Sequence, residues 1–357
     1  MAEKNNPQKI AFKKRPLGKS GMEITTVGLG TWAIGGGGWS FGWGPQDDND
    51  SIGAIRHGVE LGINWVDTAA VYGFGHSEEM VGRAIKDIPA KERPYIFTKC
   101  GMVFDPAKRF DPPRQSLRPE SIRRECEASL RRLGVERIDL YQFHWPDGST
   151  PIADSWGEMG RLIEEGKVRA GGVSNFSVPQ LEELEQARRA KQQLPHLDSL
   201  QPPFSMIRRN SAADVIPWCA AHETGVIVYS PMQAGLLTEK MTAERVAKFP
   251  EDDWRRRTPE FQEPNLSRNL KLRDALRPIA ERHQASNAEI AIAWVLSWPG
   301  VTGAIAGARS AAQVDGWIRA GQIVLTAQDL DEIARLIGQT GAGSGPTRAG
   351  TAQAAAN

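Results

Sequence analysis

The sequence predicts an α/β protein that folds as a single-domain (β/α)8 TIM barrel with an insertion after its seventh strand. Short runs rich in β-branched residues alternate with helical patterns, and eight such units can be counted along the chain. This alternation indicates parallel strands that are joined by crossover helices. Eight units within a chain of 357 residues suit one closed barrel better than two doubly wound sheets.

The first half of the chain contains four of the expected strands, over residues 24–32, 63–69, 95–100 and 138–145. The helices between them are expected over residues 51–61, 78–88 and 119–134. In the last of these helices, apolar residues recur at intervals of four, four and three, namely Ile122, Cys126, Leu130 and Leu133. Pro119 suits the first turn of that helix, and Gly134 suits its end.

The second half of the chain repeats this order of elements. Strands are expected over residues 168–174, 197–204, 226–230 and 302–306. Helices are expected over residues 152–166, 179–190, 213–223, 287–297 and 312–320. With the first half, these elements complete one barrel domain over residues 15–340.

Three segments do not follow the alternation. Residues 1–14 are expected to form a flexible N-terminal extension. Residues 341–357, GAGSGPTRAGTAQAAAN, are expected to form a disordered tail because they have almost nothing to bury. Residues 238–272 form the insertion after the seventh strand. A long loop after a barrel strand is usually functional, so this insertion is expected to cover the active face like a lid.

The composition is that of a soluble globular protein. Hydrophobic residues make up 40% and charged residues 24%, and the formal net charge of +1 gives no indication of a nucleic-acid or membrane partner. The N-terminus has no apolar core and is therefore no secretory signal. The three cysteines form no C-x-x-C pair, and the histidines share no metal-ligand spacing. These features predict a cytoplasmic protein without disulfides or bound metal, and no protein partner is evident.

Four polar residues lie at or just beyond the ends of predicted strands. Asp67 closes the second strand, and Tyr72 lies in the loop just after it. Lys99 closes the third strand and His144 the fourth. All strands of a parallel barrel end on one face, and adjacent strands lie about 4.8 Å apart. The four side chains are therefore expected to meet above the barrel mouth as an active site.

These residue types suit the transfer of a proton to or from a carbonyl oxygen. A free tyrosine has a pKa of about 10, and a neighbouring ammonium group lowers that pKa. Lys99 would supply this charge to Tyr72, and Asp67 would be the counter-ion that keeps Lys99 protonated. His144 would orient the carbonyl or share in the proton relay. Such a site lacks only a two-electron donor.

Two other arrangements of similar residues are excluded. Gly28, Gly30 and Ala33 satisfy the G-x-G-x-x-A dinucleotide pattern, but the five glycines between residues 35 and 42 cannot hold the helix that a Rossmann loop opens. Short-chain dehydrogenases place tyrosine and lysine on one helix as Y-x-x-x-K, and Tyr72 and Lys99 are too far apart for that pattern.

The four residues and several motifs resemble the aldo-keto reductase superfamily, in which Asp, Tyr, Lys and His form the catalytic tetrad of a (β/α)8 barrel that binds NADPH. The similarity runs from Arg15 to about Gly338 and includes RPLGKSGMEITTVGLGTW, GVSNFS, LQPPFS, VYSPMQAGLLTEK and AIAGARSAAQV. The motifs GTWAIGG, YGFGHSEE and GLLTEK are most similar to the bacterial general-stress-type and potassium-channel-β-like branch.

The resemblance implies that Tyr72 is the general acid, that Lys99 and Asp67 adjust its pKa, and that His144 orients the substrate. It implies cofactor contacts at Thr31, Trp32 and Asp67, and around the nicotinamide at Ser174, Asn175, Gln201 and Tyr229. It also implies a pyrophosphate-binding loop, whose small residues let backbone N–H groups approach the phosphates. The loop contains Ser230, Pro231, Met232, Ala234, Gly235 and Leu237. Lys240 and Arg255 are implied as further contacts to the pyrophosphate. The adenosine end is implied at Gly307, Ala308, Arg309 and Gln313. A guanidinium there suits a 2′-phosphate, which favours NADP over NAD.

The expected function is that of an NADPH-dependent oxidoreductase that reduces aldehydes and some ketones, with Tyr72 as the proton donor. One alternative is a cofactor-binding redox sensor or regulatory subunit. Another is a sugar or alcohol dehydrogenase that works in the oxidative direction. The glycine-rich segment around residues 35–44 either is a surface loop or helps to form an apolar substrate pocket, whose expected walls are Trp32, Trp39, Trp43, Phe74 and Trp145.

Overall fold

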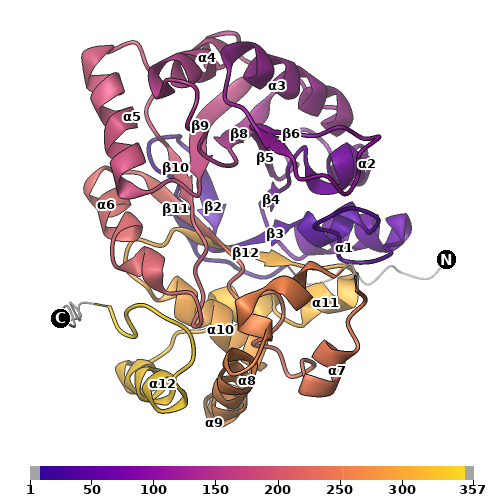
Figure 1. Ribbon diagram of the computed structural model, residues 1–357, viewed down its shortest axis with the longest axis vertical. Coiled ribbons are helices and arrows are strands. Elements are labelled where there is room, and N and C mark those ends of the chain that lie inside the picture. Colours follow the sequence, from indigo (N-terminus) through magenta and orange to yellow (C-terminus); the bar gives the residue numbers. More distant parts are fainter. Residues whose placement is uncertain (1–8, 252, 350–357) are drawn as a thin grey trace.

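The computed structural model describes residues 9–251 and 253–349, and its centre is a closed barrel of eight parallel strands (Figure 1). The strands follow one another around the barrel in chain order, and the last pairs with the first to close it. Their bounds are β3 (Val27–Gly30), β4 (Trp65–Asp67), β5 (Tyr95–Cys100), β8 (Ile138–Phe143), β9 (Val168–Ser174), β10 (Ser199–Gln201), β11 (Gly225–Tyr229) and β12 (Gly303–Gly307). The predicted fold class is confirmed.

The helices that alternate with these strands surround the barrel (Figure 1). They are α1 (Asp48–Glu60), α2 (His76–Ile85), α3 (Pro119–Leu133), α4 (Ile152–Glu164), α5 (Val178–Ala190), α6 (Val215–Ala221), α10 (Asn287–Leu296) and α11 (Ala311–Asp315). Local signals fix their ends. Pro119 begins α3, and Gly134 follows it with a left-handed φ of 64°. Ser286 and Glu289 form a capping box at the start of α10.

Two expected elements are each divided in the structure. The strand expected over 24–32 becomes β2, which pairs with β1 in a hairpin, and β3, which enters the barrel. The helix expected over 312–320 ends as α11 before Gly316, and the 3-10 helix Ile318–Gln322 follows. Further elements were not expected: β1 (Lys14–Pro16), β2 (Glu23–Thr25), β6 (Met102–Val103), β7 (Arg114–Gln115), α7 (Ala243–Ala247), α8 (Asn265–Ala275), α9 (Arg277–Arg282) and α12 (Ala327–Thr340).

Apolar side chains fill the N-terminal end of the barrel. Leu17, Met22 and Ile24 from the β1–β2 hairpin segment pack with Trp65 and Phe97 from inside the barrel. The Trp65 indole N–H also donates to a backbone carbonyl of β2 at 2.7 Å. Because Trp65 begins β4, this plug leaves the C-terminal ends of the strands to the functional groups. A larger apolar core lies between the strands and the surrounding helices.

Both chain ends are more ordered than the sequence predicted, as far as the structure describes them. Ile10 donates a backbone hydrogen bond to Leu61 at 2.8 Å, and residues 14–16 form β1, so residues 9–14 are not a flexible extension. Ala342 is buried, and the chain around it forms backbone hydrogen bonds to the loop after β10. The prediction of disorder from residue 341 is therefore wrong for residues 341–349. Residues 1–8 and 350–357 lie outside the described residues.

Within the described residues, no helix is long and apolar enough to cross a membrane. The same residues contain no group of three or more His, Cys, Asp or Glu side chains that could hold a metal ion. Cys100, Cys126 and Cys219 are buried free thiols.

Candidate active site

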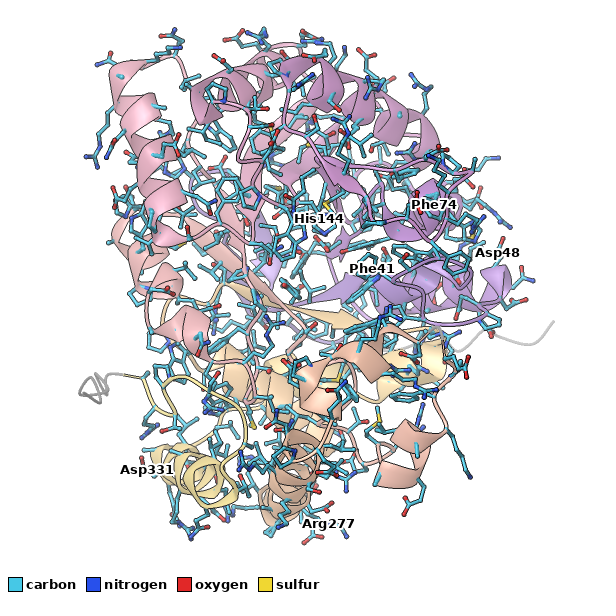
Figure 2. The ribbon with its side chains drawn as sticks, in the orientation of Figure 1. Phe41, Asp48, Phe74, His144, Arg277 and Asp331 are labelled. Atoms are coloured by element: carbon cyan, nitrogen blue, oxygen red, sulfur yellow. The ribbon has the colours of Figure 1, made fainter. Side chains whose placement is uncertain are left out.

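The four predicted catalytic residues converge at the C-terminal end of the barrel. Asp67 ends β4, Lys99 lies near the end of β5, and Tyr72 begins a 3-10 helix, Tyr72–Gly75, just beyond β4. His144 follows β8, and its backbone N–H donates to the Cys100 carbonyl at 2.9 Å. In Figure 2, His144 lies near the middle of the barrel, and Phe74 lies on the side of α2. The strand order thus brings together residues that are distant in the sequence.

Asp67 and Lys99 form a buried ion pair. Lys99 Nζ lies 2.5 Å from Asp67 Oδ1 and also donates to the Thr68 carbonyl at 2.9 Å. Both side chains are almost inaccessible to solvent. The second carboxylate oxygen of Asp67 accepts a hydrogen bond from Gln201 Nε2 at 2.9 Å. The charge of Lys99 is therefore largely neutralised by a fixed partner.

The pKa of Tyr72 differs from the prediction. Burial raises the pKa of Tyr72 well above its usual value, and the negative charge of Asp67 raises it further. The pKa of Tyr72 is not lowered below its usual value as predicted, because the burial of the phenol and the charge of Asp67 outweigh the effect of the nearby Lys99 ammonium group. Burial also lowers the pKa of Lys99, while Asp67 opposes that decrease. Without a bound cofactor, Tyr72 is a protonated phenol at neutral pH.

His144 lies against Tyr72, with ring centroids 5.7 Å apart and planes at 78°. Burial lowers the pKa of His144 well below its usual value, and the positive charge of Lys99 lowers it further. The imidazole is therefore neutral at pH 7 and can donate one hydrogen bond and accept another. Lys99 Nζ lies 5.3 Å from the centre of the Tyr72 ring, so all three groups border one small volume.

A buried carboxylate behind β5 was not assigned to the site from the sequence. Glu78 is fully buried, accepts a hydrogen bond from Thr98 at 2.6 Å and pairs with Arg132 at 2.6 Å. Thr98 directly precedes Lys99, and the charge of Glu78 also helps to raise the pKa of Lys99. The sequence showed Glu78 only as an acid in the first turn of a helix, and its partners on β5 and α3 could not be read from that position.

Polar side chains at the ends of β9, β10 and β11 form a connected group. Ser174 Oγ donates to the Gln201 carbonyl at 2.8 Å, and Asn175 Nδ2 donates to Ser174 Oγ at 3.0 Å. The Tyr229 hydroxyl donates to Asn175 Oδ1 at 2.9 Å. Asn175 also donates to the His144 carbonyl at 3.0 Å, which links this group to the four residues. The residues predicted around a nicotinamide are therefore assembled beside the predicted catalytic ones.

The loop after β11 has the backbone conformation of an anion-binding nest. Ser230, Gln233, Ala234 and Gly235 all have positive φ angles, of 57°, 47°, 51° and 88°. Among the described residues, the backbone N–H groups of Met232, Ala234 and Gly235 have no hydrogen-bond acceptor. Successive backbone N–H groups in αR–αL or turn conformations form concave sites for anions. Of the other residues predicted here, Pro231 and Leu237 are buried and Lys240 is exposed.

Two arginines, Arg255 and Arg309, lie close enough for their charges to interact, and both contact Trp43. Arg309 Nε donates to Gln46 Oε1 at 2.6 Å and Nη1 donates to the Trp43 carbonyl at 3.1 Å. Arg255 pairs with Asp253 at 2.6 Å and lies over the Trp43 ring at 4.9 Å. Burial, and then the positive charge of Arg255, lower the pKa of Arg309. Two like charges in partly buried positions favour an anion between or beside them.

The remaining residues predicted at the adenosine end lie around Arg309. Its backbone N–H donates to Gln313 Oε1 at 2.9 Å. Gly307 is exposed at the end of β12, and Ala308 is buried. A cleft of about 530 Å³ lies nearby, between residues 42–45 and residues 242–255 of the insertion.

Aromatic rings cover the mouth of the barrel. Trp32 stacks on Tyr72 with a centroid distance of 6.2 Å and on Trp254 with 4.9 Å, and Trp43 meets Trp32 edge-on at 5.3 Å. Trp254 belongs to the insertion and was not predicted as a site residue. Its only signal in the sequence was its position beside Arg255 in a loop that was expected to cover the site.

Two of the other predicted pocket residues, Trp39 and Phe74, lie in the same hydrophobic cluster as Trp32 and Tyr72. Trp39 and Phe74 pack together at 5.8 Å, and Phe104 packs on Phe74 at 5.0 Å. Trp145 is 38% exposed and stacks on no other ring among the described residues. The structure thus places these rings near Tyr72 and leaves Trp145 at the edge.

The sequence model described as the Aldo/keto reductase family matches residues 26–337. The chain belongs to this family. The resemblance seen in the sequence is therefore confirmed. Members of the family are oxidoreductases that act on carbonyls or alcohols with nicotinamide cofactors, and this coarse activity holds for the chain.

This aldo-keto reductase is 35% identical to aldo-keto reductase YhdN of Bacillus subtilis over 325 residues, covering 91% of this chain and 93% of the relative. It is 36% identical to the NADH-specific methylglyoxal reductase of Escherichia coli, covering 85% and 91%. Among solved structures, the glycerol dehydrogenase AKR11B4 from Gluconobacter oxydans matches with a TM-score of 0.81 and 38% identity, covering 94% of this chain and 98% of that one.

The depressed pKa of His144 predicts a pH-dependent loss of stability in this aldo-keto reductase. The unfolded chain binds a proton at this histidine near pH 6.5, and the folded chain does so only at lower pH, so stability falls as the pH falls below about 6.5. Between about pH 7.5 and about pH 5.5, His144 is expected to account for at most about 1.4 kcal/mol of this loss. Urea unfolding of the wild type and of His144→Asn at both pH values measures the part of this loss that is due to His144. Equal losses in the two proteins would contradict the assignment.

Proposed function

We propose that this aldo-keto reductase reduces aldehydes and some ketones to alcohols, with Tyr72 as the proton donor. The observation that supports this most directly is the protonated phenol of Tyr72, held beside a neutral His144 and over the buried Lys99–Asp67 pair. A bound nicotinamide cofactor supplies the hydride for the carbonyl carbon. Tyr72 then gives its proton to the carbonyl oxygen.

The neighbours of Tyr72 have separate tasks in this reaction. The neutral imidazole of His144 donates a hydrogen bond that orients the carbonyl oxygen toward the Tyr72 hydroxyl. Proton donation leaves a negative charge on the tyrosine, and the ammonium group of Lys99, 5.3 Å from the ring centre, stabilises that charge. Asp67 keeps Lys99 protonated in spite of its burial.

Several features of the chain fit the phosphates and rings of a dinucleotide. The nest at Met232, Ala234 and Gly235 offers free N–H groups to a pyrophosphate. The guanidinium groups of Arg255 and Arg309, whose charges interact, provide positive charge. The buried indole N–H groups of Trp43 and Trp254 have no hydrogen-bond acceptor among the described residues, which fits a polar ligand beside them.

We also propose that NADPH is preferred over NADH. Arg309 uses three of its five N–H donors on Gln46 and on the Trp43 and Pro45 carbonyls, and two donors remain for a 2′-phosphate. Arg309→Met is expected to lower kcat/KM for NADPH by about 10- to 100-fold, the value of a charged hydrogen bond. The value for NADH should change little. Arg319→Met, on the 3-10 helix after α11, is the control and should affect neither. Equal losses with both cofactors would contradict the 2′-phosphate role.

An activity screen tests the main proposal. Purified protein is assayed for oxidation of NADPH and NADH with aldehydes and ketones, and for the reverse reaction with alcohols and sugars. The aromatic rings near Tyr72 support aromatic or medium-chain carbonyls as substrates. Faster reverse reactions would favour an alcohol dehydrogenase, which the similarity to a glycerol dehydrogenase supports as the second candidate. Negligible single-turnover rates with every substrate would instead indicate a redox sensor.

The location of the protein and the role of the insertion are further parts of the proposal. Three buried free thiols support a reducing, cytoplasmic location. The stacking of Trp254 on Trp32 supports a role for residues 238–272 in covering the bound cofactor and substrate.

A further inference from the structure

The segment that follows α12 is attached to the loop after β10. Figure 1 shows the yellow end of the chain running from α12 toward α6. The Ser344 N–H donates to the Ile207 carbonyl at 3.0 Å, and the Arg209 N–H donates to the Ser344 carbonyl at 2.9 Å. Ala342 is 1% exposed. Residues 341–345 therefore pack against this loop like an added short strand.

Arg209 holds the segment in place. Its side chain is buried, and Nε donates to the Gly345 carbonyl at 3.1 Å while Nη1 donates to the Ala342 carbonyl at 3.1 Å. Nη1 also donates to the Met206 carbonyl of its own loop. Burial lowers the pKa of Arg209 to about 10, so the guanidinium stays charged at neutral pH. A single charged group thus connects the two segments through their carbonyls.

The segment fits this loop only with glycine at residue 343. Gly343 has a φ of 61°, and a Cβ atom added there would lie 1.9 Å from the Ile207 carbonyl oxygen. A side chain at this position would force the two segments apart, since the contact is with backbone rather than with a flexible side chain. Gly338 in α12 offers a contrast, because a Cβ atom there would meet nothing within 4 Å.

The same loop is connected to the nest. Ser205 is fully buried, and its hydroxyl oxygen accepts hydrogen bonds from the N–H groups of Ile207 at 3.1 Å and Arg208 at 3.0 Å. The Ser205 hydroxyl donates to Gln233 Oε1 at 2.9 Å. Gln233 has a φ of 47° and lies between the free N–H groups of Met232 and Ala234. A continuous set of contacts therefore runs from Gly343 to the nest.

We propose that residues 341–345 are a positioning element for the cofactor. By fixing the turn at residues 205–209, they hold Gln233 in its left-handed conformation and keep the neighbouring N–H groups directed at the cofactor phosphates. This inference rests on the proposed function, which places the pyrophosphate in the nest. It assigns the segment to cofactor affinity and gives it no part in the transfer of hydride or proton.

The test compares Gly343→Ala with Gly338→Ala as its matched control. The Kd of NADPH and of NADH is measured by fluorescence titration, and kcat is measured at saturating cofactor. Gly343→Ala is expected to raise the Kd roughly 3- to 30-fold, in the range of coupling through packed contacts, and to change kcat by less than about twofold. Gly338→Ala should leave both unchanged. An unchanged Kd in Gly343→Ala overturns the inference.

Ser205→Ala tests the route of the effect and does not depend on the folding of Gly343→Ala. It leaves residues 341–345 themselves unchanged. It removes the hydrogen bond to Gln233 together with those that Ser205 accepts from Ile207 and Arg208, so it should raise the Kd on its own. In the double variant, the loss of cofactor-binding free energy should be smaller than the sum of the losses in the two single variants, because both changes release Gln233. Full additivity, or no effect of Ser205→Ala, overturns the inference. If the wild type binds neither cofactor, the proposed function itself fails, which is a distinguishable result.

Discussion

Replacing Tyr72 by phenylalanine is expected to reduce turnover by about 10²- to 10⁴-fold, the usual contribution of a general acid. The change removes one oxygen atom and leaves the ring that stacks on Trp32 and packs against His144. Tyr72 supplies the proposed proton beside Lys99, so without its hydroxyl the carbonyl oxygen loses that donor. The Kd of the cofactor should change less than about twofold, since the phenol hydroxyl makes no contact with the nest.

Single-turnover rates with saturating cofactor and aldehyde measure this loss. Tyr95→Phe is the matched control, because Tyr95 begins β5 at the opposite end of the barrel, where its ring lies under Arg169. Turnover in Tyr95→Phe should equal that of the wild type. If Tyr72→Phe also retained wild-type turnover, Tyr72 would not be the proton donor, and His144 would have to be tested in its place.

The arrangement of the site could be predicted because parallel topology determines it. Once eight alternating units indicate a barrel, every strand end lies on one face, and Asp67, Lys99 and His144 must meet there. The bounds of β5 and β9 agree with the strands predicted over residues 95–100 and 168–174. The loop after β11 was predicted as a cofactor loop from its resemblance to the family motif, and the structure gives Ala234 and Gly235 in this loop positive φ angles.

The electrostatics of the site could not be predicted from residue types. The sequence shows that Lys99 lies near Tyr72, but the pKa of Tyr72 depends on its burial and on how fully Asp67 neutralises that lysine. The sequence likewise gives no sign that Glu78 contacts Thr98. The GAGSG segment has the composition of a disordered tail, yet its glycines allow the close backbone contact with residues 207–209. In each case, tertiary contacts decide the outcome.

Replacing Lys99 by methionine is expected to destabilise the protein by about 3–5 kcal/mol, because a buried carboxylate loses its partner. Asp67 keeps its hydrogen bond from Gln201, but that neutral donor cannot replace an ammonium group at 2.5 Å. The unpaired Asp67 should then gain a raised pKa and bind a proton on folding, so the loss should be smaller at acidic pH than at neutral pH. Urea unfolding at both pH values measures this difference.

The double variant Lys99→Met with Asp67→Asn separates the cost of an unpaired charge from the loss of packing. It should recover a large part of the stability, since no buried charge remains, but it should recover no activity, because nothing stabilises the charge left on Tyr72. Lys19→Met is the control: it removes an ion pair with Glu223 whose side chains are 52% and 70% exposed, and it should change stability little. A double variant as unstable as Lys99→Met would show that the lysine stem, rather than the charge pair, maintains this end of the barrel.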